Sequence, residues 1–152
     1  MTMKNHVKST CRSAFFQLLK ISKIKKYLDN DSLKTVIQAC VTSRLDYGNA
    51  LLNGTTATNI KLLQQVQNSA ARMLTGTKRT DHITPVLKSL HWLPVEHRIT
   101  FKTLSIAYSA LNDENSPAYI KDMLHHYQPT RALRSADDKL LHVPKTKTKM
   151  GE

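Results

Sequence analysis

The chain has 152 residues, of which 40% are hydrophobic, and this length and composition fit one globular domain with a modest core. Four glycines and five prolines are too few for a low-complexity or fibrous protein, and no apolar run approaches the roughly 20 residues of a membrane-spanning helix. The formal net charge of +12 predicts a long-range field that attracts phosphate backbones and says little about base sequence.

The positive charge is concentrated at the two ends of the chain. Residues 1–28 hold seven Lys or Arg and no acid, and residues 129–150 hold six against two aspartates. An anionic membrane surface is a rival partner, but we favour nucleic acid because no exposed aromatic face is expected on the basic N-terminal helix. The N-terminus lacks a compact apolar block and a small-residue cleavage site, so no secretory signal is expected. Cys11 and Cys40 fall on apolar-facing helical positions, which favours reduced, buried thiols of an intracellular protein over a disulfide.

Residues 4–28 are expected to form one amphipathic helix, because apolar side chains repeat there at helical spacing. The predicted apolar side comprises Val7, Cys11, Ala14, Phe15, Leu18, Leu19 and Ile21. The cations Lys8, Arg12, Lys23 and Lys26 fall largely off that side. Two interpretations stay open for them: they neutralise phosphates, or they form an ordinary solvated face.

Residues 29–31 interrupt this pattern, and a second helix is expected to follow. Asp31 or Ser32 is expected to cap it, and the two helices would then form an antiparallel hairpin. Arg44, near the end of the second helix, either reaches a phosphate or forms a local polar cluster with Asp46. We favour the local cluster, because such side-chain bonding is frequent at helix ends.

A third long helix is expected at about residues 59–75, followed by a mobile, positively charged loop at residues 76–81. One side of this helix carries a polar stripe at spacings of four, three and four: Lys61, Gln65, Asn68 and Arg72. Its amides and cations suit bases, sugars and phosphates, but such faces are usually only hydrated, and we favour hydration. Lys78 and Arg79 at the tip of the loop are candidates for phosphate contacts.

Pro85 and Pro94 each stand where a helix can begin, so the sequence predicts a short helix, a tight corner at Trp92–Leu93 and a long amphipathic helix. Trp92 is the only tryptophan, and it is expected to pin the corner to the core. The expected apolar stripe of the long helix consists of Val95, Ile99, Leu104, Ala107 and Leu111.

Aromatic and cationic side chains interleave near one face of the long helix: His97, Phe101, Tyr108, Arg98 and Lys102. Groups arranged in this way can stack on and clamp a single strand, but we favour packing, because a long helix also needs a core stripe. A last short helix is expected at residues 118–126. Past residue 128 the helical period is lost, which predicts an irregular basic tail over residues 129–152.

No catalytic or cofactor motif is present in the sequence. The chain lacks a P-loop, a Gly-x-Gly-x-x-Gly turn and a Gly-x-Ser-x-Gly elbow. The spacing of His82, His91 and His97 matches no closed zinc pattern, and the eleven acids are too scattered for a nuclease centre. We therefore expect no cofactor, no metal and no small-molecule substrate.

Three blocks in order resemble one known family: SRLDYGNALLNG, LQQVQNSAARMLTG and HITPVLKSLHWLPVEHRITFK. They are similar to the region that follows the polymerase palm in reverse transcriptases of LINE-type (non-LTR) retrotransposons, of the jockey and chicken-repeat kind. The resemblance runs from about Cys11 to Pro144. It implies a thumb-side or connection segment of an RNA-directed DNA polymerase, which would hold template RNA or the primer–template duplex by its backbone.

Two features depart from the family pattern. The chain contains no Phe/Tyr-Ala/Val-Asp-Asp box, so catalysis is not expected of this fragment, and Gly48 stands where the family commonly has cysteine in an LDYCN block. The partners that the resemblance implies are the RNA or DNA backbone and the polymerase palm of the parent protein. Two alternatives stay open: a helical protein-interaction or packing module, and an inert relic of a decayed transposable element.

The sequence thus predicts an all-α fold of five to six helices, with a helical domain over residues 1–128 and the basic tail over residues 129–152. The fold combines an N-terminal hairpin, a long third helix and a proline-bounded helix, corner and helix. The side chains expected to contact nucleic acid are Lys8, Arg12, Lys23, Lys26, Arg44, Lys61, Arg72, Lys78, Arg79, Arg98, Lys102, Arg131 and Arg134. The protein is expected to act in the cytoplasm or the nucleus.

Overall fold

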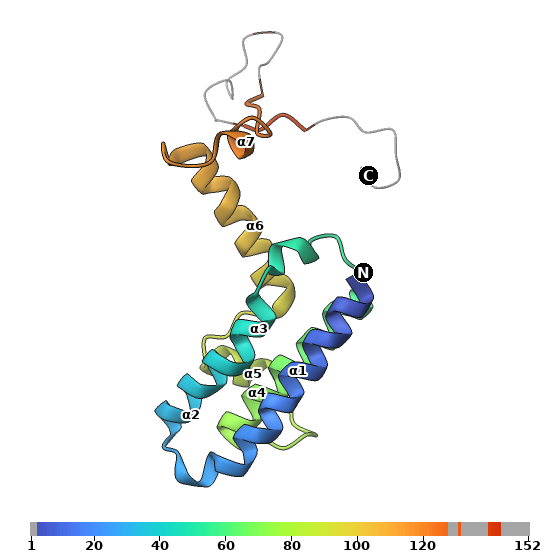
Figure 1. The fold of residues 1–152 in the computed structure, drawn as a ribbon, viewed down its shortest axis with the longest axis vertical. Helices are drawn as coiled ribbons and strands as arrows, with labels where there is room; N and C mark the ends of the chain where they lie inside the picture. Colours follow the sequence, from blue (N-terminus) through green and yellow to red (C-terminus); the bar gives the residue numbers. More distant parts are fainter. Residues whose placement is uncertain (1–2, 128–130, 132–139, 144–152) are drawn as a thin grey trace. The chain divides into compact units, whose positions relative to one another are not determined.

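The computed structural model describes residues 3–127, 131 and 140–143, and the chain divides into two compact units, Met1–Thr103 and Leu104–Glu152. The α-helices are α1 (Met3–Ile24), α2 (Asn30–Ile37), α3 (Ser43–Asp46), α4 (Ala57–Thr75), α5 (Thr84–Ser89), α6 (Val95–Asn112) and α7 (Ala118–Lys121) (Figure 1). Short 3-10 helices, η1 (Lys25–Tyr27) and η3 (Asn49–Leu52), and a π-helical turn, η2 (Gln38–Thr42), lie between them.

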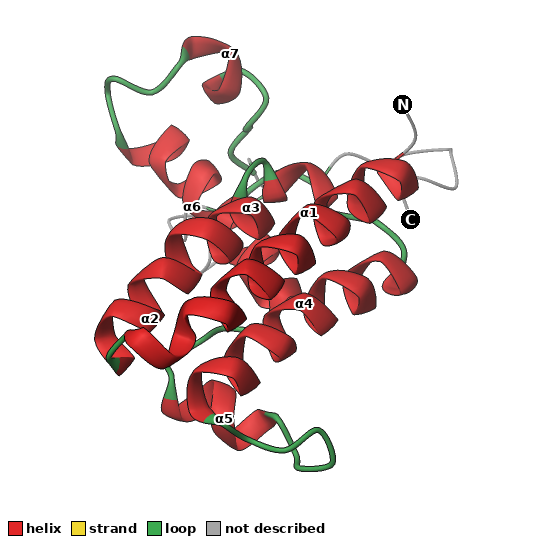
Figure 2. Ribbon diagram, turned by 60° about the horizontal axis from the view of Figure 1, so that its bottom comes forward, coloured by secondary structure: helices red, strands yellow, loops and turns green. Residues whose placement is uncertain are grey.

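The all-α prediction is confirmed. With α2, η2 and α3 counted as one continuous run and the 3-10 helices η1 and η3 left out, the described residues form six helices and no strand. Figure 2 shows the helices in red. The predicted domain boundary at residue 128 stays a prediction, because most of the residues after it, Arg134 included, lie outside the described part.

The predicted N-terminal hairpin is present in the first unit. The chain turns through η1, and the run of α2, η2 and α3 returns antiparallel to α1, while α4 lies alongside α1 (Figures 1 and 2). The second helix begins two or three residues earlier than predicted, because Asp29 and not Asp31 or Ser32 caps it. The Asp29 Oδ2 atom accepts hydrogen bonds from the backbone N–H groups of Asp31 and Ser32, both at 3.1 Å.

The core of the first unit is built from a regular stripe on α1 and the facing sides of the other helices. The buried residues of α1 recur at spacings of four, three, four and three: Val7, Cys11, Ala14, Leu18 and Ile21. Helix α4 buries Leu63, Val66, Ala70, Ala71 and Leu74 in the same cluster. Small side chains, Ala14 on α1 and Ala70 and Ala71 on α4, allow these two helices to pack closely. Their solvent-facing sides are therefore neighbours on the surface of the unit.

The corner between α5 and α6 forms as predicted. Helix α5 ends in a Schellman motif, in which the backbone N–H of Trp92 donates to the carbonyl of Leu87 at 2.8 Å and that of His91 donates to Lys88 at 3.0 Å. His91 occupies the left-handed position of this motif, with a φ of 56°. Trp92 is buried in the core cluster, so its predicted packing role is confirmed.

The second unit differs from two expectations. Of the predicted apolar stripe on α6, Val95 and Ile99 are buried in the first unit, whereas the Leu104 side chain is 63% exposed. Helix α7 ends at Lys121, five residues before the predicted end, and the chain beyond it forms an isolated antiparallel bridge between His126 and Leu141. The backbone N–H of Tyr127 donates there to Leu140 at 2.7 Å, which is incompatible with a helix continuing to His126.

Candidate nucleic-acid interface

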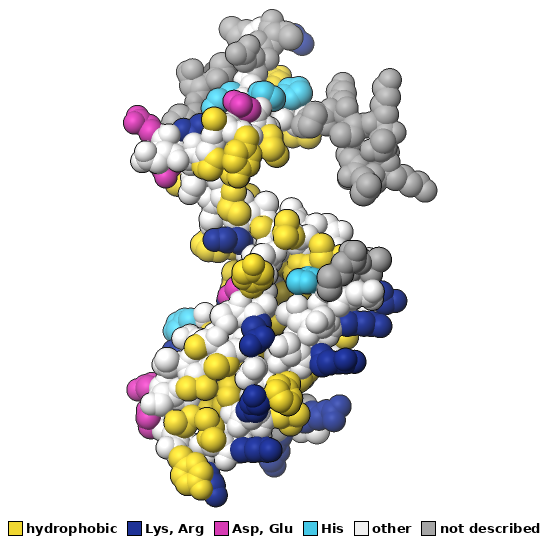
Figure 3. Space-filling view, viewed as in Figure 1, with side chains coloured by type: hydrophobic (Ala, Val, Ile, Leu, Met, Phe, Trp, Pro, Cys, Tyr) yellow, Lys and Arg dark blue, Asp and Glu magenta, His cyan; other side chains and the backbone are white. Residues whose placement is uncertain are grey.

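The outer face of α1 is cationic over its whole length. Lys8, Arg12 and Lys23 are exposed there as predicted, and they are joined by Lys4 and Lys20. Figure 3 shows Lys and Arg side chains gathered along the edge formed by α1, with hydrophobic side chains between them. Because residues 1–28 contain no acid, no carboxylate of this segment offsets their charge.

Aromatic and apolar side chains interleave with these cations, contrary to the prediction that placed two of them in the core. Phe15 is 38% exposed, Phe16 55% and Leu19 63%. The core takes Ala14 and Leu18 instead, because these positions stay on the seam that starts at Val7 and Cys11, whereas residues 15 and 19 are turned about a quarter of a helical turn away from it. The outer face of α1 is therefore a strip of alternating cationic and apolar side chains. We call it the α1 strip, and it consists of Lys4, Lys8, Arg12, Phe15, Phe16, Leu19, Lys20 and Lys23.

A groove of about 680 Å³ lies beside this strip, between α1, α4 and the loop that follows α4. It is lined by Phe15, Gln65, Asn68, Ser69, Arg72, Thr77 and Arg79. The structure thus brings together three members of the predicted polar stripe of α4 with Arg79 of the predicted loop. The lining contains two guanidinium groups, two amides and no carboxylate, which suits a polyanionic ligand.

Arg72 fixes the loop that carries Lys78 and Arg79. Its Nη1 atom donates to the backbone carbonyl of Lys78, and its Nη2 atom donates to that of Asp81 at 2.9 Å. The backbone N–H of Lys78 in turn donates to the Asp81 carboxylate at 3.2 Å. The loop was predicted to be mobile, but these bonds give it a defined conformation and present the exposed Lys78 and Arg79 side chains from it. The sequence did not reveal this role of Arg72, which depends on contacts with backbone atoms.

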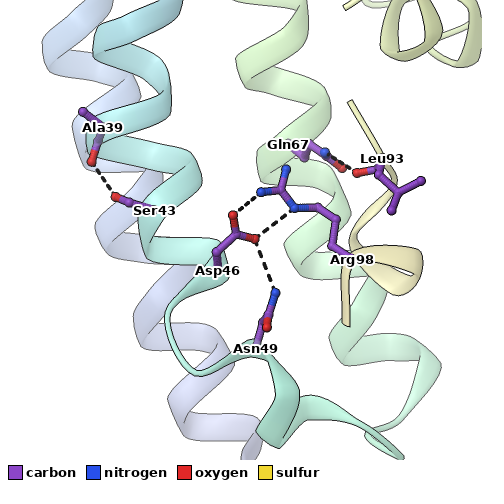
Figure 4. A network of polar contacts seen from close by, with 7 residues as sticks. All are labelled: Ala39, Ser43, Asp46, Asn49, Gln67, Leu93 and Arg98. Carbon is purple, nitrogen blue, oxygen red and sulfur yellow. Dashed lines mark hydrogen bonds and ion pairs between the residues drawn. The ribbon is translucent and has the colours of Figure 1, made fainter. Parts of the chain in front are cut away.

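Two other predicted contact residues are held by bonds within the protein. Arg98 on α6 donates through Nε to the carboxylate of Asp46 at 2.9 Å, and its Nη2 atom pairs with the other oxygen of that carboxylate (Figure 4). Arg44, which we had expected to join Asp46, donates instead to the Ser13 hydroxyl at 2.7 Å and to the carbonyl of Cys40 at 3.1 Å. Both arginines thus connect helices of the first unit.

The remaining predicted cations are dispersed. Lys61 is exposed on α4, and Arg131 is exposed in the second unit. Lys26 is exposed at the end of the hairpin, where its Nζ atom lies 4.8 Å from the centroid of the Tyr27 ring. Lys102 lines a second cavity of about 460 Å³ together with Asp46 and Arg98. Arg134 lies outside the described residues.

Two glutamines of α4, for which the sequence predicts no role, hold parts of the fold together. The Gln67 side chain is 3% exposed, and its Nε2 atom donates to the carbonyl of Leu93 at 2.8 Å (Figure 4). Gln64 donates to the Gln67 amide oxygen at 2.9 Å and accepts a hydrogen bond from the backbone N–H of Val95, also at 2.9 Å. The pair fastens the corner and the start of α6 to α4. The Nε2 atom of Gln64 also donates to the Asn68 amide oxygen at 2.8 Å, and Gln65 and Asn68 both line the groove.

Neither cysteine forms a disulfide, and burial raises the pKa of the Cys11 thiol.

Within the part of the chain that the structure describes, no group of three or more His, Cys, Asp or Glu residues is placed to hold a metal ion. No helix in that part has the length and apolar character that crossing a bilayer requires.

The chain was compared with protein-family models, with curated proteins and with solved structures, and none of them matches it.

Proposed function

We propose that this chain is a non-catalytic, nucleic-acid-binding segment of a LINE-type reverse transcriptase, in which it follows the polymerase palm. The observation that carries the proposal is the cationic strip of α1 lying beside a groove without carboxylates, into which Arg79 extends. Cations from α1 and from the loop after α4 are thereby gathered on one side of the first unit. Such a surface attracts a polyanion at long range and neutralises it on contact.

The strip and the groove offer two kinds of contact. Lys8, Arg12 and Lys23 would bind backbone phosphates without reading sequence, and their binding would release condensed counterions. In the groove, the Gln65 amide can donate to and accept from sugars or base edges, and the Asn68 amide nitrogen can donate to them. No reacting group is needed for this role, because the palm of the parent enzyme would supply the metal chemistry. The protein would act inside the cell, where template RNA and target DNA are found.

A packing module is the second candidate function, and the composition of the second unit's surface favours it. Leu104 and Tyr108 on α6, Tyr119 on α7 and Met123 just after α7 each have well over half of their surface exposed. A surface of this kind fits contact with another part of the parent protein, such as its palm. The two candidate functions use different units of the chain and are compatible with each other.

Charge substitutions distinguish a specific interface from a general effect of net charge. The variant Lys8→Gln/Arg12→Gln removes two cations from the strip, and the variant Lys34→Gln/Lys88→Gln removes two from α2 and α5. We expect the first variant to bind a labelled RNA oligomer about tenfold more weakly than the second at the same salt concentration, because only the first removes phosphate contacts. Equal losses in the two variants would show that net charge, and not this surface, determines binding.

A further inference from the structure

The α1 strip exposes two adjacent phenylalanine rings, which lie in the first unit, as the groove does. Phe15 borders the groove, and Phe16 lies on the outer side of the same helix with more than half of its surface exposed. The core seam of α1 uses Ala14 and Leu18, so packing within the described part of this unit does not account for the Phe16 ring. Large aromatic side chains surrounded by cations are a recurring feature of surfaces that bind single-stranded nucleic acid.

Cations are spaced along α1 around the Phe16 ring. Arg12 precedes Phe16 by four residues and Lys20 follows it by four, and each step advances about 6 Å along the helix on nearly the same face. The Nζ atom of Lys20 lies 4.6 Å from the centroid of the ring. This ammonium group lies over one face of the ring, so a base would stack on the other face or displace it, and Arg12 and Lys20 would then reach the flanking phosphates.

We propose that Phe15 and Phe16 form a stacking platform for unpaired bases, so that the α1 strip and its groove bind single-stranded nucleic acid in preference to duplex. The inference rests on the proposed nucleic-acid function and specifies the substrate class of the same surface. Bases in a duplex are already stacked on each other and cannot lie on a protein ring, whereas every unpaired base has a free face. The Gln65 amide and the Asn68 amide nitrogen line the same groove as Phe15, where they are placed to meet the edge of a base that enters it.

An anionic membrane is the rival partner for a basic helix with exposed aromatic residues. An interfacial helix inserts a broad apolar face into the headgroup region. In α1 the broad apolar face is already buried in the core through Val7, Ala14 and Leu18, and the exposed apolar groups form a narrow strip interrupted by cations. Single-stranded nucleic acid fits this alternation better, because it also alternates charged and aromatic groups.

The test compares three labelled oligomers of about a dozen residues, a length suited to one binding site. They are an oligouridylate, a duplex of the same length, and an abasic oligomer with the same number of phosphates. Binding of the full chain to each is measured by fluorescence anisotropy at one salt concentration. The oligouridylate is expected to bind about tenfold more tightly than the abasic oligomer, and also more tightly than the duplex, since one stacked base is worth roughly that factor.

Substitutions in α1 assign the preference to the rings. Phe16→Ala and Phe15→Ala are each expected to weaken binding of the oligouridylate about fivefold to tenfold and to leave binding of the abasic oligomer unchanged. Leu51→Ala is the control, because it removes exposed apolar surface from the same unit outside the strip and the groove, and it should change neither. Circular dichroism of each variant checks that the helices are retained.

The outcomes separate the inference from the proposed function. Equal binding of all three oligomers with a steep salt dependence would overturn the stacking platform and leave the phosphate-binding function in place. No binding of any oligomer would overturn both. Binding to phosphatidylserine vesicles without binding to the oligomers would overturn both as well, and it would assign the strip to a membrane surface.

Discussion

Arg98 on α6 and Asp46 at the end of α3 form a bidentate ion pair between two helices that are 52 positions apart in the sequence. The carboxylate of Asp46 also accepts a hydrogen bond from the Asn49 side chain at 3.4 Å. Both charged side chains are only partly exposed, so solvent weakens the interaction less than at an open surface. The pair ties the N-terminal hairpin to the first turns of α6.

The first prediction concerns the stability that this pair provides. Asp46→Asn removes the counter-charge of Arg98, and we expect it to lower the free energy of unfolding by about 1 kcal/mol. Urea denaturation followed by circular dichroism measures the change. Glu96→Gln removes a carboxylate from an exposed position on the same helix and should change stability by less than about 0.5 kcal/mol. A double-mutant cycle of Asp46→Asn with Arg98→Gln that gave no coupling energy would contradict the pairing.

The second prediction concerns the buried amide of Gln67. Gln67→Leu removes the donor to the buried carbonyl of Leu93 and one of the two acceptors of the Gln64 amide nitrogen, so we expect it to lower the free energy of unfolding by about 2 kcal/mol. Gln65→Leu on the same helix faces the groove and should cost less than about 0.5 kcal/mol. Thermal unfolding compares the two variants. Equal stability would mean that the corner does not depend on this hydrogen bond.

The third prediction uses the left-handed backbone of His91. Glycine adopts this conformation without the steric cost that a side chain incurs, so His91→Gly should raise the free energy of unfolding by about 0.5 kcal/mol. The same change at His97, within α6, should lower it by about 0.5 kcal/mol, because glycine is a poor helix former. Denaturant midpoints for the two variants therefore move in opposite directions, and a shared sign would rule out the Schellman geometry at His91.

The fourth prediction concerns the position of Arg72 beneath its loop. Arg72→Lys keeps the charge but loses the planar fork that bonds two carbonyls, so backbone amides at residues 77–81 should exchange with deuterium about tenfold faster. RNA binding should weaken at the same time, because Lys78 and Arg79 are no longer held in place. Lys61→Arg, an equally conservative change on α4, serves as the control for both measurements. Unchanged exchange in Arg72→Lys would show that the loop is ordered without it.

The fifth prediction follows from the raised pKa of the buried Cys11 thiol. A neutral thiol reacts slowly, so iodoacetamide at mildly alkaline pH should label the partly exposed Cys40 first and Cys11 only after unfolding. Because folding raises this pKa, the contribution of Cys11 to stability is complete below the ordinary thiol pKa and is lost as pH rises through the folded value. Peptide mass spectrometry reads the labelling order. Equal labelling of both cysteines in the folded protein would contradict the burial of Cys11.

Local signals in the sequence predicted most of the helices. The features that the sequence could not predict depend on contacts between residues far apart in the chain. Prolines and the single tryptophan marked the corner, since each acts on its immediate neighbours. The periodicity of α1 gave a helix but not its buried side, because Phe15 and Leu19 are as apolar as the residues that the core takes. The partners of Arg98 and Gln67 lie 52 and 26 positions away, beyond any local pattern. The groove depends in the same way on α1, α4 and a loop meeting in space.

The dependence of RNA binding on salt tests the proposed function most directly. If the strip and loop of the first unit meet about four phosphates of a single strand, the logarithm of the association constant should fall with the logarithm of salt concentration with a slope of about −3. The slope should become shallower by about 1.4 in the Lys8→Gln/Arg12→Gln variant, because two phosphate contacts are lost. A protein that bound no RNA at low salt, or whose binding did not change with salt, would contradict the account.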